Sequence, residues 1–131
     1  MELKLNGVHV LQTVEFDDYS WFFRFSDADW IRAGCLWRLL IDGAVRRTSN
    51  DHGQWFGLSA PVDLPDEVMK PIEGRAVSAI AWDDKTGDLM VTLGSDVCLQ
   101  LLVDSGGYES WEMNFDGEHY LATGGGSVIQ L

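Results

Sequence analysis

Residues 7–18, GVHVLQTVEFDD, and residues 74–84, GRAVSAIAWDD, share the pattern that decides the fold of this chain. Each stretch begins with Gly-x-x-Val and ends with an aromatic residue followed by two aspartates. Between these anchors, apolar residues alternate with other residues at a period of two, which a strand keeps on one face and a helix does not. The sequence therefore predicts two equivalent β-strands in the two halves of the chain.

A second pair of anchors extends the repeat. Trp37 is followed five and six positions later by Asp42-Gly43, and Trp111 is followed at the same spacing by Asp116-Gly117. Asp-Gly accepts the positive φ angles of a two-residue hairpin turn. The offset between the copies grows from about 67 to 74 positions, so we expect about seven extra residues in the second copy, around 105–108.

Further strands fill the first half of the chain. Aromatic and polar residues alternate from Trp21 to Ser26, and one long extended segment is expected from Trp30 to Ile41. A strand over 44–48 follows the Asp42-Gly43 turn. Gly124-Gly125-Gly126 indicates a turn before a last strand over 127–131, because no Lys-Ser or Lys-Thr follows the glycines as in a phosphate loop.

Between the two copies, a short helix is predicted at about 64–71. Pro65 and the two acids behind it suit a first helical turn, and Pro71 is expected to end the helix. The predicted fold is all-β: two similar antiparallel β-meanders, about 3–60 and 72–131, packed as a sandwich or open barrel in a single domain, 1–131, and joined by this helix. The alternative to a duplication is a chance recurrence of Asp-Gly turns.

Size and charge limit the possible functions. The chain has 131 residues, with 9 basic and 21 acidic side chains and a net charge of −12, which repels nucleic acid. No apolar run is long enough to span a membrane, and the start of the sequence lacks the pattern of an export signal, so we expect a cytoplasmic protein. Cys35 and Cys98 are then expected to be free and inert.

The charge is unevenly distributed along the chain. Residues 1–65 carry 6 basic and 9 acidic side chains, whereas residues 66–131 carry 3 basic and 12 acidic ones. No Lys or Arg follows Thr86. Such an asymmetry predicts a negative potential that can steer a cationic partner, although it also serves solubility.

Three segments place polar residues beside aromatic ones, and they supply the candidate binding or structural polar cluster. Its members are Arg38, Asp51, His52, Gln54, Tyr108, Glu109 and Trp111. A catalytic role is not predicted for Asp51 and His52, because neighbours on an extended chain point to opposite faces. The duplication instead suggests that Arg38 contacts Glu112 or Glu109, since residues 38 and 112 follow the equivalent tryptophans.

No metal site or cofactor is predicted. His9, His52 and His119 are far apart in the sequence, and none belongs to a local metal-binding motif.

The same three segments, taken in order, carry a resemblance to a known family. Trp-Arg at 37–38, Ser-x-Asp-His-Gly-Gln-x-Phe-Gly at 49–57 and Ser-Gly-Gly-Tyr-Glu-x-Trp at 105–111 resemble a family of small bacterial proteins, a domain of unknown function. The resemblance spans nearly the whole chain. It implies a bacterial cytoplasmic protein and assigns no activity or catalytic residue.

We therefore expect a non-enzymatic binding protein of an immunity or regulatory type, with an acidic face for a basic protein partner. The alternative is a small-molecule or hydrolytic site between the two meanders. It would be lined by Trp37, Trp55, Tyr108 and Trp111, with Arg38, Asp51, His52 and Glu109 as its polar groups. The protein is expected to be a monomer, or a homodimer formed through the strand edge after Gly126.

Overall fold

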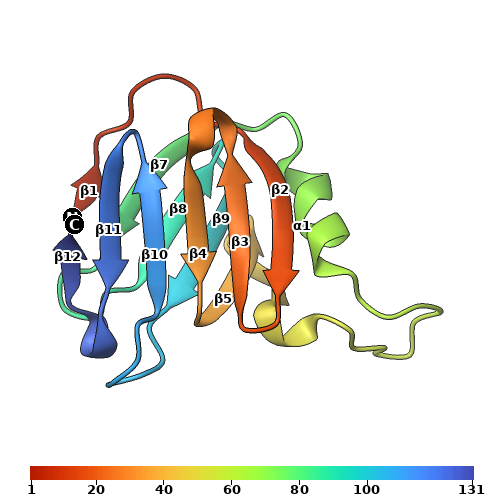
Figure 1. The fold of residues 1–131 in the computed structure, drawn as a ribbon. Helices are drawn as coiled ribbons and strands as arrows, with labels where there is room; N and C mark the ends of the chain where they lie inside the picture. Colours follow the sequence, from red (N-terminus) through yellow and green to blue (C-terminus); the bar gives the residue numbers. More distant parts are fainter.

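Two six-stranded antiparallel sheets face each other and enclose one hydrophobic core (Figure 1). The computed structural model describes all 131 residues, except for the side chain of Asp27. Sheet I contains, in spatial order, β1 (Glu2–Leu3), β7 (Val77–Trp82), β8 (Leu89–Leu93), β9 (Val97–Leu102), β5 (Leu36–Ile41) and β6 (Ala44–Thr48). Sheet II contains β12 (Val128–Gln130), β11 (Glu118–Ala122), β10 (Trp111–Phe115), β4 (Trp30–Ala33), β3 (Ser20–Phe25) and β2 (Leu11–Asp17). The all-β prediction is confirmed.

Both halves of the chain follow the same path. In the first half, the β2–β3–β4 meander lies in sheet II, and the chain then crosses to sheet I for the β5–β6 hairpin. In the second half, β7–β8–β9 lie in sheet I, and the chain crosses to sheet II for β10 and β11. Each sheet therefore combines a meander from one half with a hairpin from the other, rather than holding one half each.

The equivalent turns have equivalent backbones. Asp42 and Asp116 both have φ +51°, and Gly43 and Gly117 have φ +78° and +76°. These are the positive φ values at both central positions that a type I′ hairpin requires. The predicted correspondence of the two Asp-Gly pairs is thus seen directly in their geometry.

The expected long segment from Trp30 to Ile41 is wrong, because the chain breaks at Gly34-Cys35 and changes sheets. The Gly34 N–H donates to the Ser110 carbonyl at 2.8 Å, which ties this corner to the end of the β9–β10 loop. The equivalent crossing from β9 to β10 takes eight residues, 103–110, instead of two, and this loop contains the predicted insertion.

The linker helix α1 spans Leu64–Ile72 and packs beside β2. Asp63 caps it by accepting from the Asp66 N–H, and Leu64, Val68 and Ile72 face the core. Pro71 does not end the helix as predicted but lies inside its last turn. A proline there removes one amide hydrogen bond near the helix end, where the apolar contact of Ile72 favours continuation.

Candidate functional site

Arg38 lies on the outer face of sheet I, where its Nε donates to Gln100 Oε1 at 3.1 Å. The predicted contact with Glu112 is wrong: Glu112 lies on the outer face of sheet II, 3.3 Å from Arg32 Nη2. The reason is strand alternation. Trp37 and Trp111 both point into the core, so the residues that follow them point outward from opposite sheets. The second predicted partner, Glu109, is exposed in the β9–β10 loop.

Asp51 and His52 each serve the local fold. An Asp51 carboxylate oxygen accepts from the Thr48 N–H at 2.9 Å, which caps the short 3-10 turn at Ser49–Asp51. His52 Nδ1 accepts from the Leu64 N–H at 3.1 Å, and its ring lies edge-on to Trp21 at 5.2 Å. The imidazole therefore helps to fix the start of α1.

The remaining predicted residues lie in three different settings. Trp111 is fully buried and donates from Nε1 to the Gly87 carbonyl at 2.8 Å. Tyr108 and Glu109 are exposed in the β9–β10 loop. Gln54 is exposed beyond β6, where its backbone pairs with Val62. The four surface hollows described for this structure are lined by other side chains than these seven.

The interior between the sheets is filled by aromatic side chains. Trp37 and Trp111, which the ligand-site alternative needs as lining residues, are both 0% exposed. Trp37 packs edge-on against Trp21 and Phe23 at centroid distances of 5.3 and 5.2 Å. A ligand would contact these two tryptophans only if the core opened.

Both cysteines are free, and burial is the main reason that the pKa values of their thiols are raised. Cys35 and Cys98 form no disulfide. Burial, with smaller contributions from Asp104 and Asp88, raises the pKa of the Cys35 thiol to about 12, and burial also raises the pKa of Cys98. The raised pKa values favour the protonated, less nucleophilic form of both thiols near neutral pH.

The segment after Asp51 forms a protruding hairpin. The Gly53 N–H donates to the Val62 carbonyl at 2.9 Å, and the Val62 N–H donates to the Gln54 carbonyl at 2.8 Å. The Leu58 N–H closes the turn on the Trp55 carbonyl at 2.7 Å. Residues 53–62 contain no charged side chain. We call Trp55, Phe56 and Leu58, which are all exposed, the hairpin tip.

Phe56 has an unusual backbone for a bulky residue. Its φ is +47° and that of Gly57 is +75°, which are close to the values of the two Asp-Gly turns. Asp, Asn and Gly tolerate this left-handed region, whereas an aromatic residue there is strained. Phe56 is nevertheless 60% exposed, so its side chain gains little burial in return. Neither the backbone nor the core explains a phenylalanine at this position.

Whether Phe56 serves the fold can be tested by exchanging residues between turns of similar backbone conformation. We expect Phe56→Asp to keep or raise the free energy of unfolding, by up to about 1 kcal/mol, because Asp tolerates positive φ. The matched exchange, Asp42→Phe, should lower it by about 1 kcal/mol. Urea denaturation of both variants measures these changes. A loss above about 1 kcal/mol for Phe56→Asp would mean that Phe56 serves the fold.

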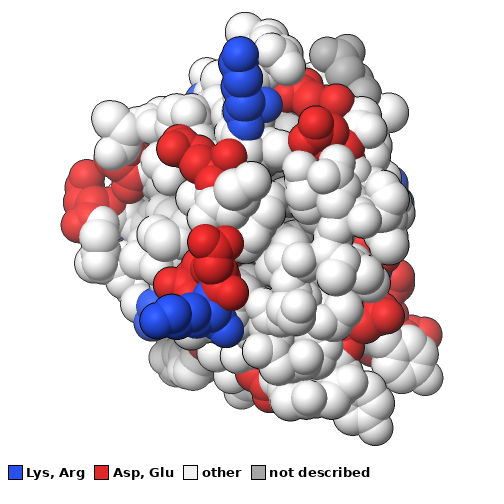
Figure 2. Space-filling model, turned by 90° about the vertical axis from the view of Figure 1, so that its left-hand side faces the viewer, with Lys and Arg blue, Asp and Glu red and all other residues white. Residues whose placement is uncertain are grey.

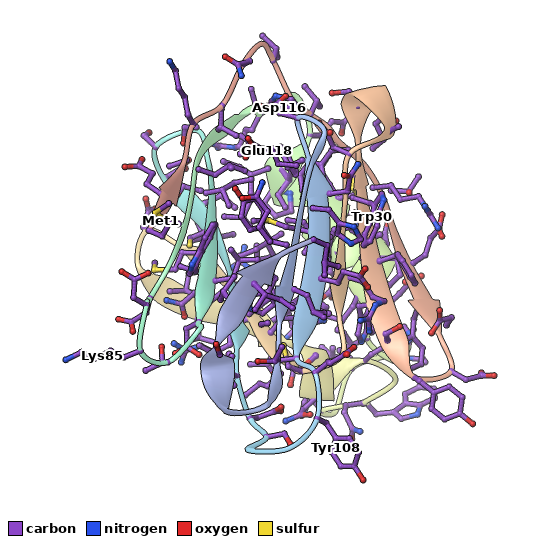
Figure 3. All side chains as sticks on the ribbon, turned by 60° about the vertical axis from the view of Figure 1, so that its left-hand side comes forward. Met1, Trp30, Lys85, Tyr108, Asp116 and Glu118 are labelled. Carbon is purple, nitrogen blue, oxygen red and sulfur yellow. The ribbon has the colours of Figure 1, made fainter. Side chains whose placement is uncertain are left out.

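The β2–β3 turn, the β7–β8 turn and the β9–β10 loop lie at one end of the sandwich (Figure 1). These segments carry exposed tyrosines and several carboxylates. Tyr19 is 93% and Tyr108 is 83% exposed, and Figure 3 shows that the Tyr108 side chain projects outward from the protein at this end. The acids here are Asp17, Asp18, Asp83, Asp84, Asp88, Asp104 and Glu109. We call this surface, together with the hairpin tip, the Tyr108 end.

Two of these acids stabilise equivalent turns. Asp17 accepts from the Tyr19 and Ser20 N–H groups, and Asp83 accepts from the Lys85 and Thr86 N–H groups. These backbone hydrogen bonds lower the pKa of both carboxyls. Their contribution to stability is therefore present above the pKa of the unfolded chain and is lost as the pH falls through the lower pKa of the folded state.

Most basic side chains form ion pairs outside the Tyr108 end. Ion pairs hold Arg24 to Glu15, Arg32 to Glu112, Arg47 to Glu67, Lys70 to Asp66 and Arg75 to Asp96. In the β7–β8 turn, Lys85 projects outward (Figure 3). Along the edge formed by β1 and β12, red acidic groups are spread over the surface and blue basic groups are fewer (Figure 2). At the Tyr108 end, Asp84 lies 3.7 Å from the N-terminal ammonium, and no described lysine or arginine forms an ion pair with the other acids of this end.

An apolar hollow of about 420 Å³ lies beside the β7–β8 turn on sheet I. Its lining includes Trp82, Met90 and Leu102, and Asp83 and Asp88 belong to its wall. An apolar floor with carboxylates beside it suits the aliphatic stem and charged head of a lysine or arginine. No sequence motif marks this hollow, because its lining comes from three strands and a turn.

Comparisons of the chain with known proteins found no match. No family model, no curated protein and no solved structure matches the chain. The resemblance to a bacterial family therefore stays a prediction. Among the described residues, no helix has the length and apolar character needed to cross a membrane.

Sequence reasoning misses part of the Tyr108 end. Tyr19 falls in a polar break between two strands, Phe56 lies in a polar-aromatic segment but is not among the seven candidate residues, and Leu58 lies just beyond that segment. One signal does exist at the tip: Phe56-Gly57 occupies a turn position where the chain elsewhere uses Asp-Gly, within a run free of charge.

Proposed function

We propose that the protein is a non-enzymatic binding protein whose Tyr108 end docks a basic protein partner. The observation that carries this proposal is Phe56, an exposed aromatic residue in a backbone conformation that disfavours it. A strained position that serves neither the core nor the turn is expected where a side chain contacts something outside the chain. Trp55 precedes it in the chain, and Tyr19 and Tyr108 are exposed at the same end of the sandwich; Trp and Tyr are enriched among binding hot spots.

The charges around the aromatic groups define the chemistry of the partner. Carboxylates of the two equivalent turns and of the β9–β10 loop lie at the Tyr108 end, so a complementary surface carries lysine and arginine. The acids accelerate encounter, and the tip and tyrosines supply buried contact area. The partner is therefore expected to present an apolar pocket with a basic rim.

The charge requirement is tested with random twelve-residue peptides displayed on phage and selected on the immobilised protein. We expect enriched peptides to combine Lys or Arg with apolar residues, and their affinity to fall as salt rises from about 50 to about 300 mM. The triple variant Asp18→Asn, Asp84→Asn, Glu109→Gln should weaken the best peptide about tenfold, at roughly 0.5 kcal/mol per charge.

A matched variant removes three exposed acids outside the Tyr108 end: Asp42→Asn, Glu73→Gln, Glu118→Gln. Both triple variants change the net charge equally, so only the location of the charges differs. Equal weakening by the two variants, or enrichment of acidic peptides, would contradict the proposed surface.

A further inference from the structure

At the end of the sandwich opposite the Tyr108 end, three distant segments bring His9, Asp29 and Asp116 together. His9 precedes β2, Asp29 follows the 3-10 turn after β3, and Asp116 lies in the β10–β11 turn. Figure 3 shows Asp116 at this end, far from Tyr108. Each residue offers a ligand atom, and these atoms lie within 4.8 Å of one another. Local spacing in the sequence gives no indication of this cluster, because its members are far apart along the chain.

Two polar atoms face each other in this cluster without a hydrogen-bond partner. His9 Nδ1 and Asp29 Oδ2 lie 2.6 Å apart, but they lack the alignment of a hydrogen bond, and neither has another partner among the described residues. The two side chains are only 3% and 4% exposed. Buried polar atoms are nearly always satisfied, so such a pair points to a cation that both atoms can bind.

The other atoms of both side chains are held in place. His9 Nε2 lies 2.7 Å from the Asn6 carbonyl and 3.0 Å from Asp116 Oδ1, and it therefore carries the proton as donor. Asp29 Oδ1 accepts from the Asp116 N–H at 3.1 Å. Metal-binding histidines typically donate their second ring N–H to a carbonyl or carboxylate in this way. The arrangement leaves a lone pair on Nδ1 next to a free carboxylate oxygen.

The charge of the cluster is also suited to a bound cation. Within the described residues, Asp29 and Asp116 place carboxylate oxygens 2.6 and 3.0 Å from the two ring nitrogens of His9, and no lysine or arginine joins them. The Asn6 N–H, which donates to Asp116 Oδ2 at 2.8 Å, adds no charge. Two carboxylates beside a neutral imidazole carry two negative charges, which a divalent ion balances.

We propose that His9, Asp29 and Asp116 form a structural site for a divalent transition-metal ion, with His9 Nδ1 and Asp29 Oδ2 as its first ligands. Zinc fits one imidazole and carboxylate oxygens better than magnesium or calcium, which prefer oxygen alone. The site joins the segment before β2 to turns of both halves, so the bound ion stabilises the fold. This inference is independent of the proposed function.

The test is thermal unfolding of the chelator-treated protein with and without zinc chloride. Zinc at about one hundred times its Kd should raise Tm by roughly 10 °C for a chain of this size. Calcium at the same concentration should have little effect. Asp29→Asn should abolish the zinc shift, whereas His119→Asn, which changes a half-buried histidine paired with Glu112, should retain it.

A spectroscopic measurement covers the case in which Asp29→Asn does not fold. Cobalt(II) added to the wild-type protein should shift the NMR signals of the His9 ring and leave those of His52 near their original positions. The absence of a zinc-dependent Tm shift, or a cobalt effect at His119 instead of His9, would overturn the proposal. A proton shared between Nδ1 and Oδ2 would then explain why these atoms lie so close together.

Discussion

Replacing Trp111 by Phe is expected to lower the free energy of unfolding by about 3–4 kcal/mol, whereas Trp37→Phe should cost only about 1–2 kcal/mol. The two residues occupy equivalent positions on β10 and β5, and both are fully buried. Only Trp111 uses its indole N–H, which donates to the Gly87 carbonyl. The Trp37 Nε1 atom has no partner among the described residues, so its removal relieves an unsatisfied polar group.

The comparison separates packing from hydrogen bonding, because the same atoms are deleted in both variants. Trp111→Phe leaves the Gly87 carbonyl buried without its donor, which adds about 1–3 kcal/mol to the packing loss. Urea denaturation of both variants gives the two values. Equal losses would show that the Trp111 hydrogen bond contributes nothing beyond packing.

Gly126→Ala is expected to lower the free energy of unfolding by more than about 3 kcal/mol or to prevent folding. A Cβ at this position would overlap the Thr86 carbonyl oxygen, and the other neighbouring atoms are also backbone. The residue also has φ +86°, where an L side chain is strained. Here the β11–β12 turn of sheet II packs directly on the β7–β8 turn of sheet I.

Gly117→Ala is the matched control for this clash. Gly117 has φ +76°, but no heavy atom lies within 4 Å of the position that a Cβ would take. The control should therefore cost only the conformational strain, about 1–2 kcal/mol. Thermal and urea unfolding of both variants measure the difference. A similar cost for the two substitutions would show that the turns at Thr86 and Gly126 separate easily.

The elements that the sequence predicts well are those set by local rules. The Asp-Gly turns demand positive φ, the alternation before Asp17 demands a strand, and Pro65 with its acids marks the start of a helix. These signals depend on neighbouring residues, so they can be read without knowing the rest of the fold. The matched pairs of turns also reveal the equivalence of the two halves.

The sequence does not predict how the halves are combined. Gly34-Cys35 carries no strong turn signal, since the corner depends on a distant carbonyl at Ser110. Without this corner, the sequence does not indicate that each half places its hairpin in the sheet that holds the meander of the other half. That exchange places Arg38 and Glu112 on the outer faces of different sheets. The cluster of His9, Asp29 and Asp116 is hidden for the same reason, because only tertiary structure unites its three segments.

The proposed docking surface is tested most directly by site-specific photocrosslinking in the cells from which the protein comes. A photoreactive phenylalanine analogue is placed at Tyr19, Phe56 or Tyr108, and at the control positions Val45 and Ile129, which are also exposed but lie on β6 and β12. We expect one basic protein to be crosslinked from all three positions at the Tyr108 end and from neither control. No adduct from these three positions, or equal adducts from Val45 and Ile129, would contradict the account.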